Sequence, residues 1–150
     1  MLSDYLKENV VVINASAKDA VDAIRISGQL LVDAHKVAPQ YVESMIEVYR
    51  DLGPYIVIAP GIALPHSKPC DLVYETCMSF CLLKEPIVFN HADNDPVRYL
   101  FALGGKNEFD HLEMLQELSR FLMDKSNIDA LSNIKNKDEF MALIKKGGKE

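Results

Sequence analysis

The sequence has few cysteines, no excess of positive charge and no long hydrophobic run. Its three cysteines, Cys70, Cys77 and Cys81, are odd in number and include no CxxC pair. This argues against a secreted disulfide framework and for a reducing compartment. Lys and Arg total 16 against 22 Asp and Glu, a net charge of −6. Non-specific binding to nucleic acid or to an anionic membrane is therefore not expected.

No segment has the pattern of a membrane span or of a signal peptide. The longest stretch without charge, Leu52–Ser67, is interrupted by proline and glycine and is too short to cross a bilayer. Met1–Asn9 carries charged residues and has no apolar core, unlike a signal peptide. Together with the cysteine pattern, these absences predict a cytoplasmic protein without direct membrane insertion.

Length and composition predict one globular domain over residues 1–150. A chain of 150 residues, 49% hydrophobic and 25% charged, can bury a core without disulfides or a metal. The sequence contains no internal repeat and no low-complexity segment. Only the segment Lys145–Glu150, rich in lysine and glycine, is predicted to fray.

Apolar runs and helical spacing of apolar residues predict strands and helices in mixed order. Strands are predicted at Val10–Ile13, Tyr55–Ala59, Thr76–Leu83, Ile87–Phe89 and Tyr99–Leu103. Helices are predicted from Ser16, with Asp19 in a capping box, to about Ala34, and at Pro39–Leu52, Glu108–Asp124, Ile128–Ile134 and Lys137–Lys146. Because the strands cluster mid-chain, we predict an α/β three-layer sandwich, a mixed sheet of about five strands with helices on both faces.

Of the four histidines, His66 has the most unusual context. It ends the run Pro60-Gly61-Ile62-Ala63-Leu64-Pro65-His66, directly after a predicted buried strand. Two prolines and a glycine restrict the backbone of this loop, and loops at strand ends often carry function. From the residues alone, a histidine that bonds its own turn is an equal alternative. Similarly, Ile62–Leu64 would either form an apolar docking rim or complete the core.

The other histidines have simpler structural interpretations. His111 lies near the start of a predicted helix. The structural interpretation is an exposed histidine in the first turn, and the functional interpretation is a second imidazole beside His66. His91 lies in a polar, turn-like segment that lacks the spacing of a calcium-binding EF-hand loop. His35 ends a helix, where a cation is favourable.

Several common site types are not favoured by the residue pattern. His66, Cys70, His91 and His111 match no standard zinc pattern. Gly104–Lys106 lacks the flanking residues of a phosphate-binding Walker loop. The chain contains no GxSxG motif and no evident pair of glycosidase acids.

The run Pro60–His66 resembles the signature of the mannitol/fructose-type EIIA domains of the bacterial phosphoenolpyruvate:sugar phosphotransferase system. In that family, a Gly-Ile-Ala-x-Pro-His motif ends in the phosphorylated histidine. Three further segments, Gly53–Tyr55, Ala59–Gly61 and Phe89–Val97, resemble the ascorbate-type branch. The similarity extends over nearly the whole chain.

The resemblance implies roles for two histidines and a set of partners. His66 matches the phosphoryl acceptor, modified on Nε2 with Nδ1 held by a backbone carbonyl, and His111 matches a supporting histidine. The implied activity is phosphotransferase: HPr phosphorylates His66, which passes the group to a cysteine of a cognate EIIB. The membrane permease EIIC then takes up ascorbate or a related pentose or hexitol. No metal or cofactor is implied, and the oligomeric state is left open, a homodimer included.

The sequence departs from the family pattern at two positions near His66. Many mannitol-type members have an arginine before the motif, and Arg50 is the single candidate here, with a spacing that does not match. Ser67 stands where a glycine is common. The Ser67 hydroxyl is a candidate donor to the phosphoryl oxygens, whereas Lys68 is most simply a solvated side chain.

Two other functions remain open from the sequence. A regulatory interaction module of the same fold would carry the same His66 loop, and adjacent EIIB and EIIC genes would instead favour transport. A metal-dependent hydrolase would use His66, His91 and Cys70, and elemental analysis of the purified protein would distinguish it.

Overall fold

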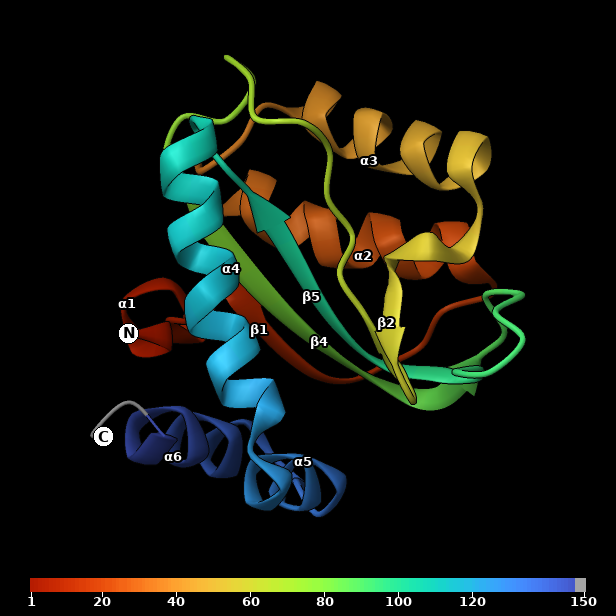
Figure 1. Cartoon of the computed structure of the whole chain (residues 1–150), viewed down its shortest axis with the longest axis vertical. Helices are drawn as coiled ribbons and strands as arrows, with labels where there is room; N and C mark the ends of the chain where they lie inside the picture. The colour runs from red at the N-terminus through yellow and green to blue at the C-terminus, as the bar shows by residue number, and fades with distance from the viewer. Residues whose placement is uncertain (148–150) are drawn as a thin grey trace.

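A five-stranded mixed sheet forms the centre of the computed structural model, which describes residues 1–147 (Figure 1). The strands are β1 (Val11–Ala15), β2 (Val57–Ala59), β3 (Ile62–Ala63), β4 (Cys77–Ile87) and β5 (Val97–Gly104). Their order across the sheet is β1-β4-β5-β3-β2. The pairs β1–β4 and β3–β5 are parallel, whereas β4–β5 and β2–β3 are antiparallel. The predicted mixed sheet is confirmed.

Helices cover both faces of this sheet, which confirms the predicted sandwich (Figure 1). On one face, α2 (Ala20–Asp33) packs on β4 and β5, and α3 (Pro39–Leu52) packs on α2. The long helix α4 (Glu108–Met123) crosses the other face. The remaining helices are α1 (Leu2–Tyr5), α5 (Lys125–Ser132), α6 (Lys137–Gly147) and the 3-10 helices η1 (Glu8–Val10) and η2 (Pro54–Ile56). In the described chain, none of the helices is both long and apolar enough for a bilayer span.

The strand predicted at Ile87–Phe89 is wrong, and the fifth strand lies elsewhere. β4 continues through Pro86 and ends at Ile87, with an irregular register against β5 after Leu82. Such irregularities are positions where a sheet tolerates proline. The fifth strand is Ile62–Ala63, which is too short to give a periodic pattern. Both of its residues are buried because it lies between β2 and β5.

The start of α2 also differs from the prediction. The helix begins at Ala20, not after Ser16, because Asp19 is its N-cap: the Asp19 carboxylate accepts a hydrogen bond from the Asp22 backbone N–H at 2.8 Å. An acidic N-cap both satisfies a free N–H group and interacts favourably with the helix dipole.

The C-terminal helices differ from the prediction in a similar way. α5 begins at Lys125, not near Ile128, because the Asp124 carboxylate accepts from the Ser126 backbone N–H at 2.9 Å. The first part of Lys145–Glu150, predicted to fray, belongs to α6. Residues 148–150 of that segment lie outside the described residues.

A stack of aromatic rings joins α6 to the sheet. Phe140 of α6 is fully buried and lies parallel to Phe80 of β4, with ring centroids 4.0 Å apart. Replacing Phe140 by alanine is expected to lower the free energy of unfolding by about 3–5 kcal/mol, because it removes a large side chain from a packed core. Urea denaturation measures this loss. The same replacement at Phe109, which is 74% exposed, should cost less than about 0.5 kcal/mol, and equal losses would contradict the assignment.

Candidate functional site

The segment that ends in His66 is fixed beside the end of β5. Pro60 and Gly61 form the turn between β2 and β3, and Gly61 adopts a φ of +77°, a backbone conformation that favours glycine. After β3, the backbone N–H of Leu103 donates to the carbonyl oxygen of Pro65 at 2.9 Å. His66 itself pairs with Leu103 in an isolated parallel bridge. The backbone of the histidine is therefore held by the sheet.

Both ring nitrogens of His66 are engaged. Nδ1 lies 2.6 Å from the carbonyl oxygen of Leu64, and Nε2 lies 3.2 Å from the hydroxyl oxygen of Tyr55. Because a carbonyl oxygen only accepts, Nδ1 carries the proton of the neutral ring and Nε2 carries the lone pair. The sequence left open that His66 bonds its own turn, and this hydrogen bond is present. It leaves Nε2 on the exposed side of the ring. Tyr55, predicted to begin a buried strand, belongs to η2 and is 48% exposed.

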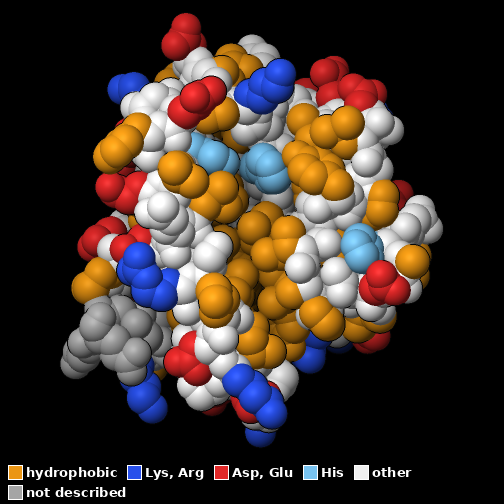
Figure 2. Space-filling model, viewed as in Figure 1, with side chains coloured by type: hydrophobic (Ala, Val, Ile, Leu, Met, Phe, Trp, Pro, Cys, Tyr) orange, Lys and Arg blue, Asp and Glu red, His pale blue; other side chains and the backbone are white. Residues whose placement is uncertain are grey.

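His111 lies next to His66 although the two are far apart in the sequence. The ring centroids are 5.9 Å apart, and Figure 2 shows histidine side chains next to each other at the edge of a hollow. Asn107 caps α4, since its side chain accepts from the Asp110 backbone N–H at 2.8 Å. This cap places His111 in the first turn of α4, directly after β5.

Gly105 permits the close approach of His111 to the end of β5. A Cβ atom at Gly105 would lie 2.5 Å from Cβ and 2.8 Å from Nδ1 of His111. That Nδ1 is buried and has no hydrogen-bond partner among residues 1–147. Burial lowers the pKa of His111 below its usual value of 6.5, and the nearby His66 ring lowers it further. His111 is therefore neutral at pH 7, and its proton is on Nε2 because a buried N–H without an acceptor is costly.

Tyr41 of α3 is a buried support of this site that the sequence analysis missed. Its hydroxyl donates to the carbonyl oxygen of Leu103 at 2.7 Å and accepts from the backbone N–H of Ser67 at 3.1 Å. Burial raises the pKa of Tyr41, so the hydroxyl remains a donor. The bonds tie the residue after His66 to β5 and α3. No sequence pattern distinguishes such a tyrosine from an ordinary core residue of a helix.

His91 lies in a turn that contacts the β2–β3 hairpin and not His66. Its Nδ1 accepts from the backbone N–H groups of Asp93 at 3.2 Å and Asn94 at 3.1 Å. The carbonyl oxygen of Asn94 in turn accepts from the backbone N–H of Gly61 at 2.9 Å. His91 therefore caps a turn, and that turn supports the hairpin that leads to His66.

Asp95 holds the same turn. Its Oδ1 accepts from the N–H of Phe89 at 2.9 Å and its Oδ2 from the N–H of His91 at 3.0 Å. Asp95→Asn is expected to lower stability by about 1–3 kcal/mol, because the new NH₂ group faces a backbone donor. Faster amide exchange at Gly61 would report the loosened hairpin. Asp93→Asn is the matched control, since Asp93 is exposed; an equal effect there would refute the role of Asp95.

The structure also places the four other features that the sequence singled out near His66. Arg50 and Lys68 are exposed, and neither forms a hydrogen bond with His66 within residues 1–147. Ser67 is half-buried directly after the histidine. Ile62–Leu64 is buried in the core, so the docking-rim interpretation of these residues is wrong. Their side chains complete the sheet because β3 is an interior strand.

No cluster of three His, Cys, Asp or Glu side chains in residues 1–147 has the arrangement of a metal site. His66, His91 and Cys70 are therefore not grouped as the hydrolase hypothesis requires. Cys77 and Cys81 are buried in β4, and burial raises the pKa of each thiol to about 12. They are packed as thiols and not as reactive thiolates.

Exposed hydrophobic side chains occur on the elements that precede the His66 loop and on the helix that carries His111. Tyr55 and Ile58 lie on η2 and β2, and Phe109 and Leu112 lie in the first turns of α4. Figure 2 shows hydrophobic side chains beside the paired histidines and within the adjoining hollow. The site thus combines two imidazoles with apolar surface that a partner can cover.

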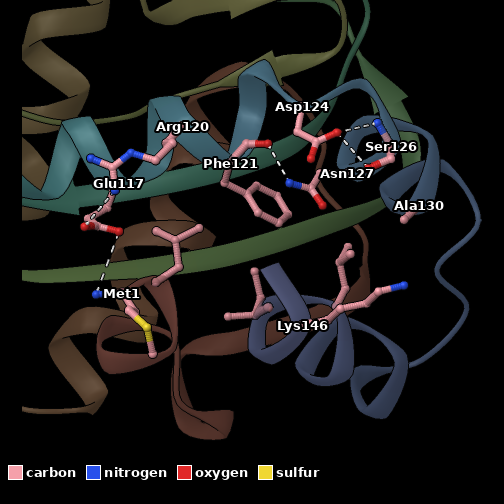
Figure 3. Close-up of a pocket in the computed structure, with 12 residues that line it drawn as sticks. Met1, Glu117, Arg120, Phe121, Asp124, Ser126, Asn127, Ala130 and Lys146 are labelled. Atoms are coloured by element: carbon pink, nitrogen blue, oxygen red, sulfur yellow. Dashed lines mark hydrogen bonds and ion pairs between the residues drawn. The ribbon is translucent and has the colours of Figure 1, made fainter. Parts of the chain in front are cut away.

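A separate cavity of about 270 Å³ lies between α4, α5, α6 and the N-terminus (Figure 3). Phe121 forms part of its apolar wall. Among its charged groups, Arg120 pairs with Glu117 at 3.3 Å. Neither His66 nor His111 lines this cavity, so it is distinct from the histidine site.

Sequence comparison relates the whole chain to one protein family. The family model for "Phosphoenolpyruvate-dependent sugar phosphotransferase system, EIIA 2" matches residues 4–147. The ascorbate-specific PTS system EIIA component of Escherichia coli strain K12 is 36% identical over 145 residues, which are 95% of this chain and 94% of that protein.

Solved structures agree with the sequence comparison. The mannitol-specific cryptic phosphotransferase enzyme IIA of Escherichia coli has a TM-score of 0.88 and 29% identity, covering 97% of this chain and 98% of that one. Mannitol enzyme IIA of Escherichia coli, solved in complex with phosphorylated mannitol enzyme IIB, has a TM-score of 0.81 and 26% identity, covering 94% and 99%. Because the matches span nearly all of each protein, the chain belongs to the EIIA 2 family of the phosphoenolpyruvate-dependent sugar phosphotransferase system.

Proposed function

We propose that this protein is a phosphoryl carrier that accepts a phosphoryl group from HPr on Nε2 of His66 and passes it to a cysteine of a cognate EIIB. The observation that carries the proposal is the 2.6 Å contact between His66 Nδ1 and the Leu64 carbonyl oxygen. It directs the ring proton to Nδ1 and leaves the Nε2 lone pair as the nucleophile. An imidazole is a competent nucleophile at neutral pH.

The transfer requires one bond to form and one to break. The Nε2 lone pair of His66 forms a bond to phosphorus, and the electron pair of the broken P–N bond returns to the ring of the HPr phosphohistidine. The Leu64 carbonyl keeps the proton on Nδ1 throughout. In the onward step, a cysteine thiolate of EIIB attacks phosphorus, and His66 leaves as a neutral imidazole. Such reactions depend mainly on positioning and on stabilisation of charge.

His111 acts as the supporting residue. It is neutral at pH 7 and donates through Nε2, since Nδ1 is buried against Gly105. Its ring lies 5.9 Å from that of His66, which is close enough for a phosphoryl group on His66 to accept a hydrogen bond from it. A donor at this position stabilises negative charge without adding a competing nucleophile.

Two relatives support the proposed partners. A mannitol enzyme IIA with the same fold was solved with phosphorylated enzyme IIB, and the ascorbate-specific EIIA components resemble this chain over almost their full length. We therefore place the protein in a cytoplasmic relay that serves uptake of ascorbate or a related pentose or hexitol through EIIC. The exposed Tyr55, Phe109 and Leu112 offer apolar surface for transient docking of both partners.

Intact-mass measurement of the purified chain after incubation with phosphoenolpyruvate, Enzyme I and HPr tests the proposal. We expect one acid-labile phosphoryl group, which peptide mapping assigns to His66. Addition of an ascorbate-type EIIB should then discharge it onto the EIIB cysteine. A folded chain that takes no phosphoryl group would refute the proposal, and a phosphorylated chain that discharges to no EIIB would favour a regulatory interaction module.

A further inference from the structure

The hydroxyl of Tyr55 contacts the one atom of His66 that reacts. It lies 3.2 Å from Nε2, and the two rings meet edge to face with centroids 5.8 Å apart. On the basis of the proposed function, we propose that Tyr55 is a third catalytic residue: its hydroxyl covers the Nε2 lone pair in the free protein and donates to a phosphoryl oxygen after transfer.

The direction of the hydrogen bond between Tyr55 and His66 follows from the proton on Nδ1, the other ring nitrogen of His66. Nδ1 of His66 is the donor to the Leu64 carbonyl oxygen at 2.6 Å. The neutral ring has no second N–H, so Nε2 is an acceptor and Tyr55 is the donor. Burial raises the pKa of Tyr55 above its usual value of 10.0, so the phenol keeps its proton at neutral pH.

The hydroxyl must move before transfer, and its surroundings allow the movement. Phosphorus approaches Nε2 along the lone pair, which is where the phenol proton lies. Tyr55 is 48% exposed, and its hydroxyl forms no other hydrogen bond within residues 1–147. A small rotation of the side chain therefore frees Nε2 without breaking core packing.

The hydrogen bond from the Tyr55 hydroxyl to a phosphoryl oxygen is stronger than its hydrogen bond to Nε2. A hydrogen bond to a phosphoryl oxygen is charge-assisted and about twice as strong as one between neutral groups. His111 supplies one neutral donor to the same group, and within residues 1–147 the exposed Arg50 and Lys68 form no hydrogen bond with the His66 ring. Tyr55 thus favours the phosphorylated state of His66 over the free state.

Tyr55→Phe keeps the ring and removes the hydroxyl. The equilibrium constant for phosphoryl transfer from HPr to this chain is expected to fall about fivefold to tenfold, the difference between a charge-assisted and a neutral hydrogen bond. Quantitative ³¹P NMR of both proteins at equilibrium measures the constant, which does not depend on docking affinity. The ³¹P resonance of phosphorylated His66 should also shift, and in the free protein the ¹⁵N resonance of His66 Nε2 should move while that of Nδ1 stays.

Tyr74→Phe is the matched control, because Tyr74 is 55% exposed and lies outside the site. It should leave the equilibrium constant and all these resonances unchanged. If wild type is phosphorylated but Tyr55→Phe changes the constant less than twofold with an unshifted ³¹P resonance, the role of Tyr55 is refuted and the carrier function stands. If wild type takes no phosphoryl group at all, both proposals fail.

Discussion

His66→Ala is expected to abolish phosphorylation of the protein. The substitution removes Nε2, the nucleophile of the proposed transfer, and neutral His111 cannot replace it because its Nδ1 is buried. Intact mass after incubation with phosphoenolpyruvate, Enzyme I and HPr should therefore show no phosphorylated species at any time. Wild type under the same conditions should become fully modified.

The fold should survive this substitution. His66 contributes two side-chain hydrogen bonds, one to its own loop and one to the exposed Tyr55, so the loss in stability is about 1–2 kcal/mol, and Tm should fall by about 2–8 °C. His35→Asn is the matched control: His35 is exposed with a φ of 61°, a conformation that asparagine tolerates. It should be phosphorylated as wild type is. Phosphorylation of a folded His66→Ala protein would disprove the assignment of the acceptor.

Gly105→Ala is expected to slow phosphoryl transfer about 100-fold, the scale of an error of roughly 1 Å in positioning. The added methyl group would lie 2.5 Å from Cβ of His111. Because that Cβ is bonded to the backbone of α4, no side-chain rotation relieves the clash, and the first turn of the helix must shift away from Gly105. Single-turnover transfer from excess phosphorylated HPr measures the rate constant.

Gly28→Ala is the control that distinguishes a displaced His111 from a clash elsewhere in the core. A Cβ atom at Gly28 would also meet a neighbour at 2.9 Å, but that neighbour is the end of the Val42 side chain, between α2 and α3. We expect lower stability and an unchanged transfer rate. If both glycine variants transfer equally well, Gly105 has no part in positioning His111.

Elements with strong local signals were predictable from the sequence. α3 has the predicted limits because Pro39 suits the first turn and Gly53 ends the helix at a φ of 74°. α4 follows from its apolar stripe and β5 from its apolar run. His66 could be singled out because the prolines and glycine that shape its loop are its immediate neighbours in the chain.

Features that depend on contacts with residues distant in the sequence were missed or placed wrongly. The pair Ile62–Ala63 is a strand only because β2 and β5 lie on either side of it. Tyr55 resembles a strand residue in sequence, yet it lies exposed beside Nε2 of His66. Tyr41 looks like a core residue until its hydroxyl is seen to bond the backbone on both sides of the site.

The sequence by itself determined the class of fold, the stiff loop and the histidine that we propose as phosphoryl acceptor, because the loop motif rests on residues adjacent in the chain and the elements rest on local patterns. Only the tertiary structure decided that His111 meets His66. β5 runs beside the His66 loop through Leu103, and the helix that carries His111 begins just after that strand ends, at the glycine that allows the close approach. Sequence separation carries no information about such a meeting, because the path of the chain through the sheet determines which side chains become neighbours.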